Sequence, residues 1–196
     1  MDFSPSPTAI EIRDRVQHFF DTEIMPRDAV FRRQHDDEGN DWPEVLVELR
    51  SMARAQGLWN MALPQLADNE PGKRLNNLEF SYAAEIMGRL AWAPFVFNCN
   101  APDAPNMEIL QMFGTPEQKE QWLTPLLNGD IRSSFAMSEP AVASSDATNI
   151  ATRIESEDDH YVINGRKWYV TNAGNPMCAF TIVMGVTDPD APSGRG

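Results

Sequence analysis

The chain has 196 residues and a formal net charge of −13 at pH 7, with 42% hydrophobic and 23% charged residues. A chain of this length and composition can bury a sizeable apolar core, so we expect a globular protein rather than a disordered one. The acidic excess argues against non-specific nucleic-acid binding, which depends on Lys and Arg neutralising phosphates. It also repels polyanionic ligands, which would therefore need a local patch of positive charge.

The sequence shows no pattern of export, membrane insertion or metal binding. Residues 1–10 lack the basic and apolar stretches of a secretory signal. The longest apolar stretch, residues 90–97, is far shorter than a membrane span. Cys99 and Cys178 form neither a CxxC motif nor a Cys/His cluster, so no metal site and no disulfide framework is predicted. We therefore expect a cytoplasmic protein without a membrane span.

Residues 8 to about 128 have the apolar periodicity of helices. Thr8 and Glu11 have the spacing of a capping box, in which both side chains bond free N–H groups at a helix start. Apolar residues then recur at helical spacing from Ile12 to Phe20. Because Pro26 lacks an N–H donor, we expect it to kink or end this helix.

Further helices are expected along the same half of the chain. The second begins near Asp41 and ends at Gly57, where a left-handed residue carries no steric penalty. The third begins around residues 76–77. Residues 115–118, Thr-Pro-Glu-Gln, predict a sharp start for the last helix, because they combine an N-cap, Pro at the first helical position and Gln at the third. This last helix should end at Gly129.

After Gly129 the sequence has the character of strands. The expected strands cover residues 131–137, 150–155, 160–163, 166–171 and 179–186. Asn164-Gly165 predicts a type I′ turn joining two paired strands, and the whole predicts an antiparallel meander. Residues 188–196 have the composition of a loop rather than of the end of a fold. The predicted fold is α+β, with a helical domain at residues 1–130 and a partial antiparallel β-domain at residues 131–196.

Common catalytic motifs are absent from the sequence. There is no GxGxxG, GxxxxGK[ST], GxSxG or HExxH. The three histidines are far apart in sequence and lie in polar or amphipathic contexts, which is typical of solvated side chains. Composition and spacing alone therefore indicate a helical region followed by a β region, and no chemistry.

A family resemblance goes further. Residues 135–140, Phe-Ala-Met-Ser-Glu-Pro, are followed at residues 144–146 by Ser-Ser-Asp. Together they resemble the signature of the acyl-CoA dehydrogenase family, in which a strand ends in a (Ser/Thr)-Glu-Pro turn and a run of small residues leads to Ser-Asp. Residues 161–172 are similar to the family's second flavin-contacting hairpin, and residues 113–119 resemble the helix before the signature. The resemblance covers most of the chain from about residue 10.

The resemblance implies FAD as the cofactor and a set of residues that contact it. The residues at flavin-contacting positions are Phe135, Met137, Ser138, Tyr169 and Thr171. Backbone amides at Met137 and Ser138 would face the pyrimidine ring, and the Thr171 hydroxyl would lie near flavin N5. Ser144 or Ser145 would approach the cofactor pyrophosphate or the coenzyme A moiety. No catalytic residue is expected here, because family members carry the catalytic Glu in a C-terminal helical bundle that is absent from residues 1–196.

The resemblance also implies a reaction and partners. Family members convert a fatty acyl-CoA to a trans-2-enoyl-CoA and pass electrons to an acceptor such as an electron-transfer flavoprotein. The complete enzyme is expected to be a homo-oligomer, or a partner chain would supply the bundle. Without that bundle we expect this chain to be inactive alone. Residues 143–149 resemble the branch that favours long or branched acyl chains.

Two departures from the family pattern leave alternatives open. The family usually has Trp where this sequence has Tyr169, with Trp168 one position earlier, so either ring could meet the flavin. The run from Glu139 to Asp146 is one residue longer than usual and lacks the family's glycines, which permit close backbone approach to phosphate. An acyl-CoA oxidase or flavin monooxygenase relative, and a non-catalytic helical interaction module, are the alternative functions.

Overall fold

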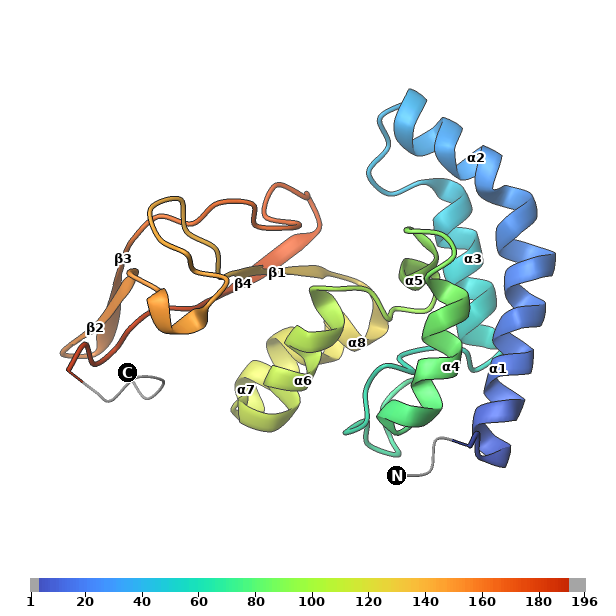
Figure 1. The fold of residues 1–196 in the computed structure, drawn as a ribbon, viewed down its shortest axis with the longest axis horizontal. Helices are drawn as coiled ribbons and strands as arrows, with labels where there is room; N and C mark the ends of the chain where they lie inside the picture. Colours follow the sequence, from blue (N-terminus) through green and yellow to red (C-terminus); the bar gives the residue numbers. More distant parts are fainter. Residues whose placement is uncertain (1–3, 191–196) are drawn as a thin grey trace. The chain divides into compact units, whose positions relative to one another are not determined.

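A computed structural model describes residues 4–190 of the chain (Figure 1). The chain divides into two compact units, Met1–Asp130 and Ile131–Gly196. Most of the predicted loop at 188–196 lies outside the described residues. No helix in the described part of the chain is long and apolar enough to cross a membrane. The predicted α+β class is confirmed, since a helical unit precedes a small β unit.

Helix α1, Pro7–Phe19, begins earlier than the sequence pattern predicted. Its N-cap is Ser6, whose hydroxyl accepts a hydrogen bond from the Ala9 N–H at 3.1 Å. Pro7 at the first helical position has the right φ and needs no acceptor, so it makes this earlier start favourable. The predicted capping box of Thr8 and Glu11 is therefore wrong, because both residues lie inside the helix.

Pro26 does not end the first helical path. A π-helical segment η1, Phe20–Ile24, precedes it, and a 3₁₀ segment η2, Met25–Arg27, contains it. The path continues through α2, Asp28–Arg32, and a second π-helical segment η3, Arg33–Asp37. Local changes of helical pitch accommodate a residue that lacks an N–H donor, so the chain continues instead of stopping.

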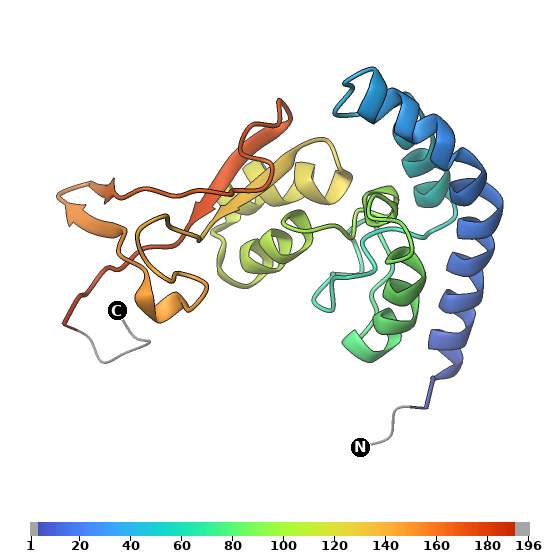
Figure 2. The same ribbon diagram turned by 45° about the horizontal axis from the view of Figure 1, so that its top comes forward.

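Four further helices follow in this unit (Figures 1 and 2), and the first three of them contribute to one apolar core together with α1 and α2. They are α3 (Glu44–Ala55), α4 (Asn77–Met87), α5 (Ala93–Val96) and α6 (Asp103–Phe113). Helix α1 packs along α4, and α3 packs against α5. As predicted, α3 is followed by a left-handed Gly57, with φ of 69°. The largest fully buried side chains are Ile12, Phe19, Phe20, Ile24, Leu49, Leu58, Met61, Leu63, Leu66, Leu75, Met87 and Phe97.

The last helical path of this unit confirms the cap chemistry read from the sequence. It runs through α7 (Pro116–Gln118), a π-helical segment η4 (Lys119–Leu123) and α8 (Thr124–Asn128). Thr115 and Gln118 form a reciprocal capping box at its start. Gly129, with φ of 77°, ends it in the left-handed conformation.

Buried amide side chains bind the carboxyl end of α8. The Asn98 side-chain amide donates to the Leu126 carbonyl at 3.1 Å and to the Asn60 Oδ1 at 2.7 Å. The Asn60 amide and the Trp59 indole N–H both donate to the Leu127 carbonyl, at 2.9 Å each. The last carbonyls of a helix have no intrahelical donor, so these side chains supply the partners that water would otherwise provide.

In the part of the β unit that the structure describes, residues 131–190, the strands form two separate two-stranded sheets. Strand β1, Arg132–Ala136, pairs in parallel with β4, Cys178–Val183. Strand β2, Arg153–Glu157, pairs antiparallel with β3, His160–Asn164, and a short 3₁₀ turn η5, Ala147–Asn149, precedes them. The predicted antiparallel meander is therefore wrong for β1 and β4. Their connection spans residues 137–177, which is long enough for the crossover that parallel pairing requires.

The predicted Asn164-Gly165 hairpin turn is also wrong. The β2–β3 turn lies at residues 158–159, in the acidic run between the strands predicted at 150–155 and 160–163, and Asp158 there has a φ of 50°. Residues 166–171 do not form a strand. Glycine is needed at position 165 because a Cβ there would overlap the side chain of Thr152. A close packing contact, and not a turn with positive φ, therefore explains Gly165.

Replacing Asn98 by Ala should destabilise the helical unit. The change leaves the Leu126 carbonyl and the Asn60 Oδ1 without this buried donor, so the free energy of unfolding should fall by about 1–3 kcal/mol. Urea unfolding followed by tryptophan fluorescence measures the change. Asn77→Ala, at an exposed position, is the matched control and should leave the midpoint within experimental error. Equal midpoints for the two variants would contradict this role of Asn98.

Candidate functional site

The candidate site begins where the chain leaves β1. Phe135, half-buried in the strand, pairs with Ile182 of β4. Met137 and Ser138 follow the strand directly and are also half-buried. The predicted flavin-facing segment is therefore a short extension of a buried parallel strand, which gives it a fixed starting point.

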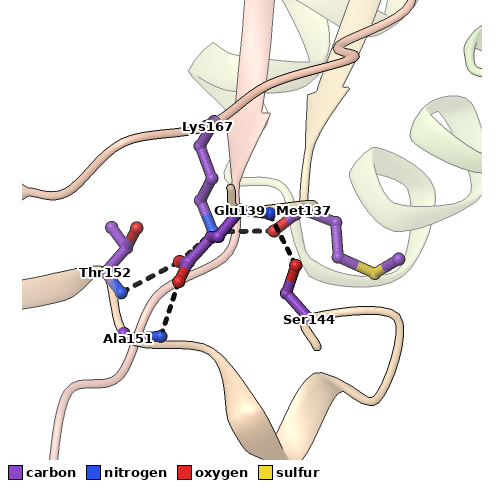
Figure 3. Close-up of polar contacts among 6 residues, drawn as sticks. All are labelled: Met137, Glu139, Ser144, Ala151, Thr152 and Lys167. Atoms are coloured by element: carbon purple, nitrogen blue, oxygen red, sulfur yellow. Dashed lines mark hydrogen bonds and ion pairs between the residues drawn. The ribbon is translucent and has the colours of Figure 1, made fainter. Parts of the chain in front are cut away.

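Glu139 anchors this extension (Figure 3). Its side chain is 4% exposed, and both carboxylate oxygens accept hydrogen bonds. Oε1 accepts from the Thr152 backbone N–H at 2.9 Å and from Lys167 Nζ at 2.8 Å, and Oε2 accepts from the Ala151 backbone N–H at 2.9 Å. The Glu139 backbone N–H donates to Ser144 Oγ at 2.5 Å. Glu139 thus connects its own segment to Ser144, to residues 151–152 and to Lys167.

The same contacts determine the charge of Glu139. Burial by itself would raise the pKa of the carboxyl group, but the hydrogen bonds from Lys167, Thr152 and Ala151 outweigh it and lower the pKa to about 2. A carboxylate with such a low pKa is a weak base, and its oxygens are already bonded. Glu139 is therefore an anchor and not a proton acceptor.

Residues 167–172 lie beside β1 and its extension because two groups bond to the extension and a third bonds to the strand. Lys167 Nζ donates to the Met137 carbonyl at 2.9 Å, and the Trp168 backbone N–H donates to the Ser138 carbonyl at 3.1 Å. The Asn172 side-chain amide donates to the Ser133 carbonyl of β1 at 3.0 Å. The two segments that the sequence predicts to contact flavin are therefore adjacent in space.

Close to these attachments, Trp168 and Tyr169 expose aromatic rings and Thr171 carries an exposed side chain with a hydroxyl. Tyr169 is 85% exposed and has a φ of 49°, which is uncommon for a residue with a bulky side chain. Its ring centroid lies 4.7 Å from that of Trp168, which is also exposed. Thr171 is exposed as well. Strained backbone in a position held by surrounding contacts is typical of ligand sites.

The two candidate serines have different environments. Ser144 is 3% exposed, and its hydroxyl accepts the Glu139 N–H within the loop. Ser145 is exposed. Asp146 then closes the loop by accepting from the Thr148 N–H at 3.0 Å and the Thr148 hydroxyl at 2.7 Å. Of the two serines, only Ser145 presents its side chain to solvent.

Lys167 and Asn172 were not singled out by the sequence analysis. The available signal was slight: Lys167 is the only lysine after Asp130, and it lies in the segment that resembles the flavin-contacting hairpin. Within residues 4–190, no three His, Cys, Asp or Glu side chains are grouped so that they could hold a metal ion.

Glu139→Gln should destabilise the β unit, because it leaves the buried Lys167 amine without its counter-charge. Removing one partner of a buried ion pair typically lowers the free energy of unfolding by about 3–5 kcal/mol. The Glu139 pKa is depressed from 4.5 to about 2, so its contribution is complete above pH 4.5 and is lost as the pH falls toward 2. Urea unfolding at several pH values between these limits measures both effects.

The exposed Glu155→Gln is the matched control for this prediction and should change stability by less than about 0.5 kcal/mol. If Glu139→Gln unfolds like this control at neutral pH, the buried ion pair is not the anchor. The difference between the wild-type chain and Glu139→Gln should also shrink as the pH falls, because protonation removes the same charge.

Comparison with known proteins identifies the family. The model of the acyl-CoA dehydrogenase N-terminal domain matches residues 6–130, and that of the acyl-CoA dehydrogenase middle domain matches residues 134–195. Acyl-CoA dehydrogenase family member 11 from Homo sapiens is 44% identical over 182 residues, which is 90% of this chain and 23% of that protein.

Solved structures share the fold. One from Mycobacterium abscessus, assigned to the acyl-CoA dehydrogenases, has 50% identity and a TM-score of 0.86 over 96% of this chain and 48% of that one. A glutaryl-CoA dehydrogenase from Mycobacterium smegmatis, in complex with FADH₂, has 22% identity and a TM-score of 0.64 over 93% of this chain and 43% of that one. The chain thus spans less than half the length of these relatives. It belongs to the acyl-CoA dehydrogenase family.

Proposed function

We propose that this chain supplies the helical and flavin-facing parts of a FAD-dependent dehydrogenase that converts fatty acyl-CoA to trans-2-enoyl-CoA. The observation that carries the proposal is the hydrogen bonding of residues 137–138 to Lys167 and Trp168, the residues just before Tyr169 and Thr171. The two segments come from distant parts of the sequence and resemble the family's two flavin-contacting strands. Their adjacency is what a shared ligand requires.

The groups at this position suit an isoalloxazine ring. Within the described residues, no acceptor is assigned to the Ser138 N–H or to the Thr171 hydroxyl, so both can donate to a ligand. The exposed rings of Trp168 and Tyr169 provide aromatic surface for a flat, polarisable group. When bound, FAD supplies a hydride acceptor for the substrate β-hydrogen. The chain's own donors would orient that ring and favour negative charge on it.

The cofactor phosphates need a separate contact. Ser145 is the better candidate for it, since it is exposed while the Ser144 hydroxyl is occupied inside the loop. The cofactor bound in the Mycobacterium smegmatis relative supports a flavin for this fold. By the same family relationship we propose an electron-transfer flavoprotein as the electron acceptor and a homo-oligomeric complete enzyme. The cytoplasmic location stays a prediction from the sequence alone.

Thr171→Val should weaken FAD binding while keeping the shape of the side chain. Loss of one hydrogen bond raises the binding free energy by about 0.5–1.5 kcal/mol. Titration of the chain with FAD, followed by flavin fluorescence, measures the dissociation constant. Thr187→Val, at an exposed position of the same unit, is the matched control and should bind FAD like the wild-type chain. If the wild-type chain fails to bind FAD, or if the two variants bind equally, the assigned site is wrong.

The 196-residue chain alone should not oxidise acyl-CoA. Glu139, the carboxylate that anchors the candidate site, is buried and bonded to Lys167. The absence of a positioned general base typically slows such a reaction by about 10²–10⁴-fold. The assay supplies FAD, saturated acyl-CoAs and an artificial electron acceptor, with a complete family enzyme as the positive control. Turnover by this chain at a rate near that of the control would mean that a base lies within its residues.

A further inference from the structure

We propose that Lys167 is a positioning residue that directs the Ser138 backbone N–H toward the ligand side of the candidate site. The inference rests on the proposed flavin function and assigns a role to a side chain that the family resemblance left without one. Lys167 would not touch the ligand. It would act through the peptide group between Met137 and Ser138.

The geometry of the peptide group carries the first step. A trans peptide is planar, and its C=O and N–H point to opposite sides. The Met137 carbonyl accepts a hydrogen bond from Lys167 Nζ at 2.9 Å. The N–H of the same peptide, which belongs to Ser138, therefore points away from the lysine. Among the described residues no acceptor is assigned to this N–H, which leaves it free for a ligand.

The second step is that Ser138 is held on its other side too. Its carbonyl accepts the Trp168 backbone N–H at 3.1 Å. The peptide before Ser138 and the peptide after it are thus both bonded to consecutive residues, Lys167 and Trp168. Rotation of the Met137–Ser138 peptide would break the lysine bond first, so the lysine controls the direction of the free N–H.

The third step is that the Lys167 amine is itself held in place. Its amine lies 2.8 Å from Glu139 Oε1, and the two side chains are only 11% and 4% exposed. Glu139 is in turn bonded by the backbone N–H groups of Ala151 and Thr152. Figure 3 shows the amine between the carboxylate and the Met137 carbonyl. A charged donor makes a stronger hydrogen bond than a neutral one, which suits it to hold a carbonyl against rotation.

A purely structural ion pair and a positioning lysine predict different results. Lys167→Met removes the bond to the Met137 carbonyl and the charge together. Glu139→Gln removes the charge pair but leaves the amine able to donate to that carbonyl. If the pair only stabilises the fold, both variants should affect the ligand site alike. If Lys167 positions the peptide, Lys167→Met should affect Ser138 far more.

The test uses the ¹⁵N-labelled 196-residue chain and FAD as the probe, under conditions where circular dichroism shows every variant to be folded. Amide hydrogen exchange at Trp168 and the amide chemical shift of Ser138 report on the peptide without a ligand. FAD titration reports on the free N–H. In Lys167→Met, exchange at Trp168 and the FAD dissociation constant should each rise on the order of 10-fold, the effect of losing one hydrogen bond.

Glu139→Gln should raise the FAD dissociation constant by no more than about 3-fold, and Lys167→Arg, which keeps a charged donor, should restore part of the loss. The charge-matched control Lys119→Met, in the helical unit, should leave all readouts unchanged.

Equal effects of Lys167→Met and Glu139→Gln on FAD binding would overturn the proposal, as would unaltered exchange and shift in Lys167→Met. Failure of the wild-type chain to bind FAD would contradict the proposed function instead, and the two amide measurements would then decide the role of Lys167.

Discussion

The candidate site depends on one buried ion pair, between Glu139 and Lys167. Burying two charges is unfavourable unless each is paired and its remaining hydrogen-bonding groups are satisfied. Here the carboxylate also receives the N–H groups of Ala151 and Thr152, and the amine also bonds the Met137 carbonyl. The pair therefore does more than join two side chains. Its lysine also bonds the peptide group that carries one proposed ligand donor, the Ser138 N–H.

This arrangement explains how a segment without regular structure can form a defined surface. Residues 165–170 belong to no helix or strand, yet Lys167 and Trp168 attach them to the extension of β1. Asn172 attaches the chain again, at Ser133. Thr171 and the strained Tyr169 lie between these attachments, so the exposed groups are displayed by a short, doubly anchored stretch. Anchoring at both ends reduces the conformational entropy that a ligand would otherwise have to remove.

Helix caps and helix ends were predictable from the sequence, whereas contacts between distant residues and the pairing of distant strands were not. The capping box at Thr115, the left-handed Gly57 and the helix end at Gly129 depend on neighbouring residues only, and the structure confirms them. The Asn164-Gly165 turn failed because Gly165 packs against Thr152, a contact that no local pattern encodes. The parallel pairing of β1 with β4 was missed for the same reason, since it joins strands separated by a long connection.

The candidate site shows the same division. Family resemblance predicted two flavin-contacting segments from their residue order, and the structure places these segments next to each other. It did not reveal the pair that holds them together, whose members are 28 residues apart in the sequence. Nor did it separate Ser144 from Ser145, since burial of the Ser144 hydroxyl depends on the folded loop. A motif thus indicated where a ligand would lie, and only the structure indicated what supports the residues around it.

The central claim is that the Met137–Ser138 backbone and Thr171 form one flavin-binding surface. The most direct test is to map backbone amide shifts of the ¹⁵N-labelled chain as FAD is added. The account predicts that the largest shifts occur together at Ser138 and in the segment from Tyr169 to Thr171, and that they saturate with a single dissociation constant. Saturable shifts confined to the helical unit, or an absence of shifts in both segments, would contradict it.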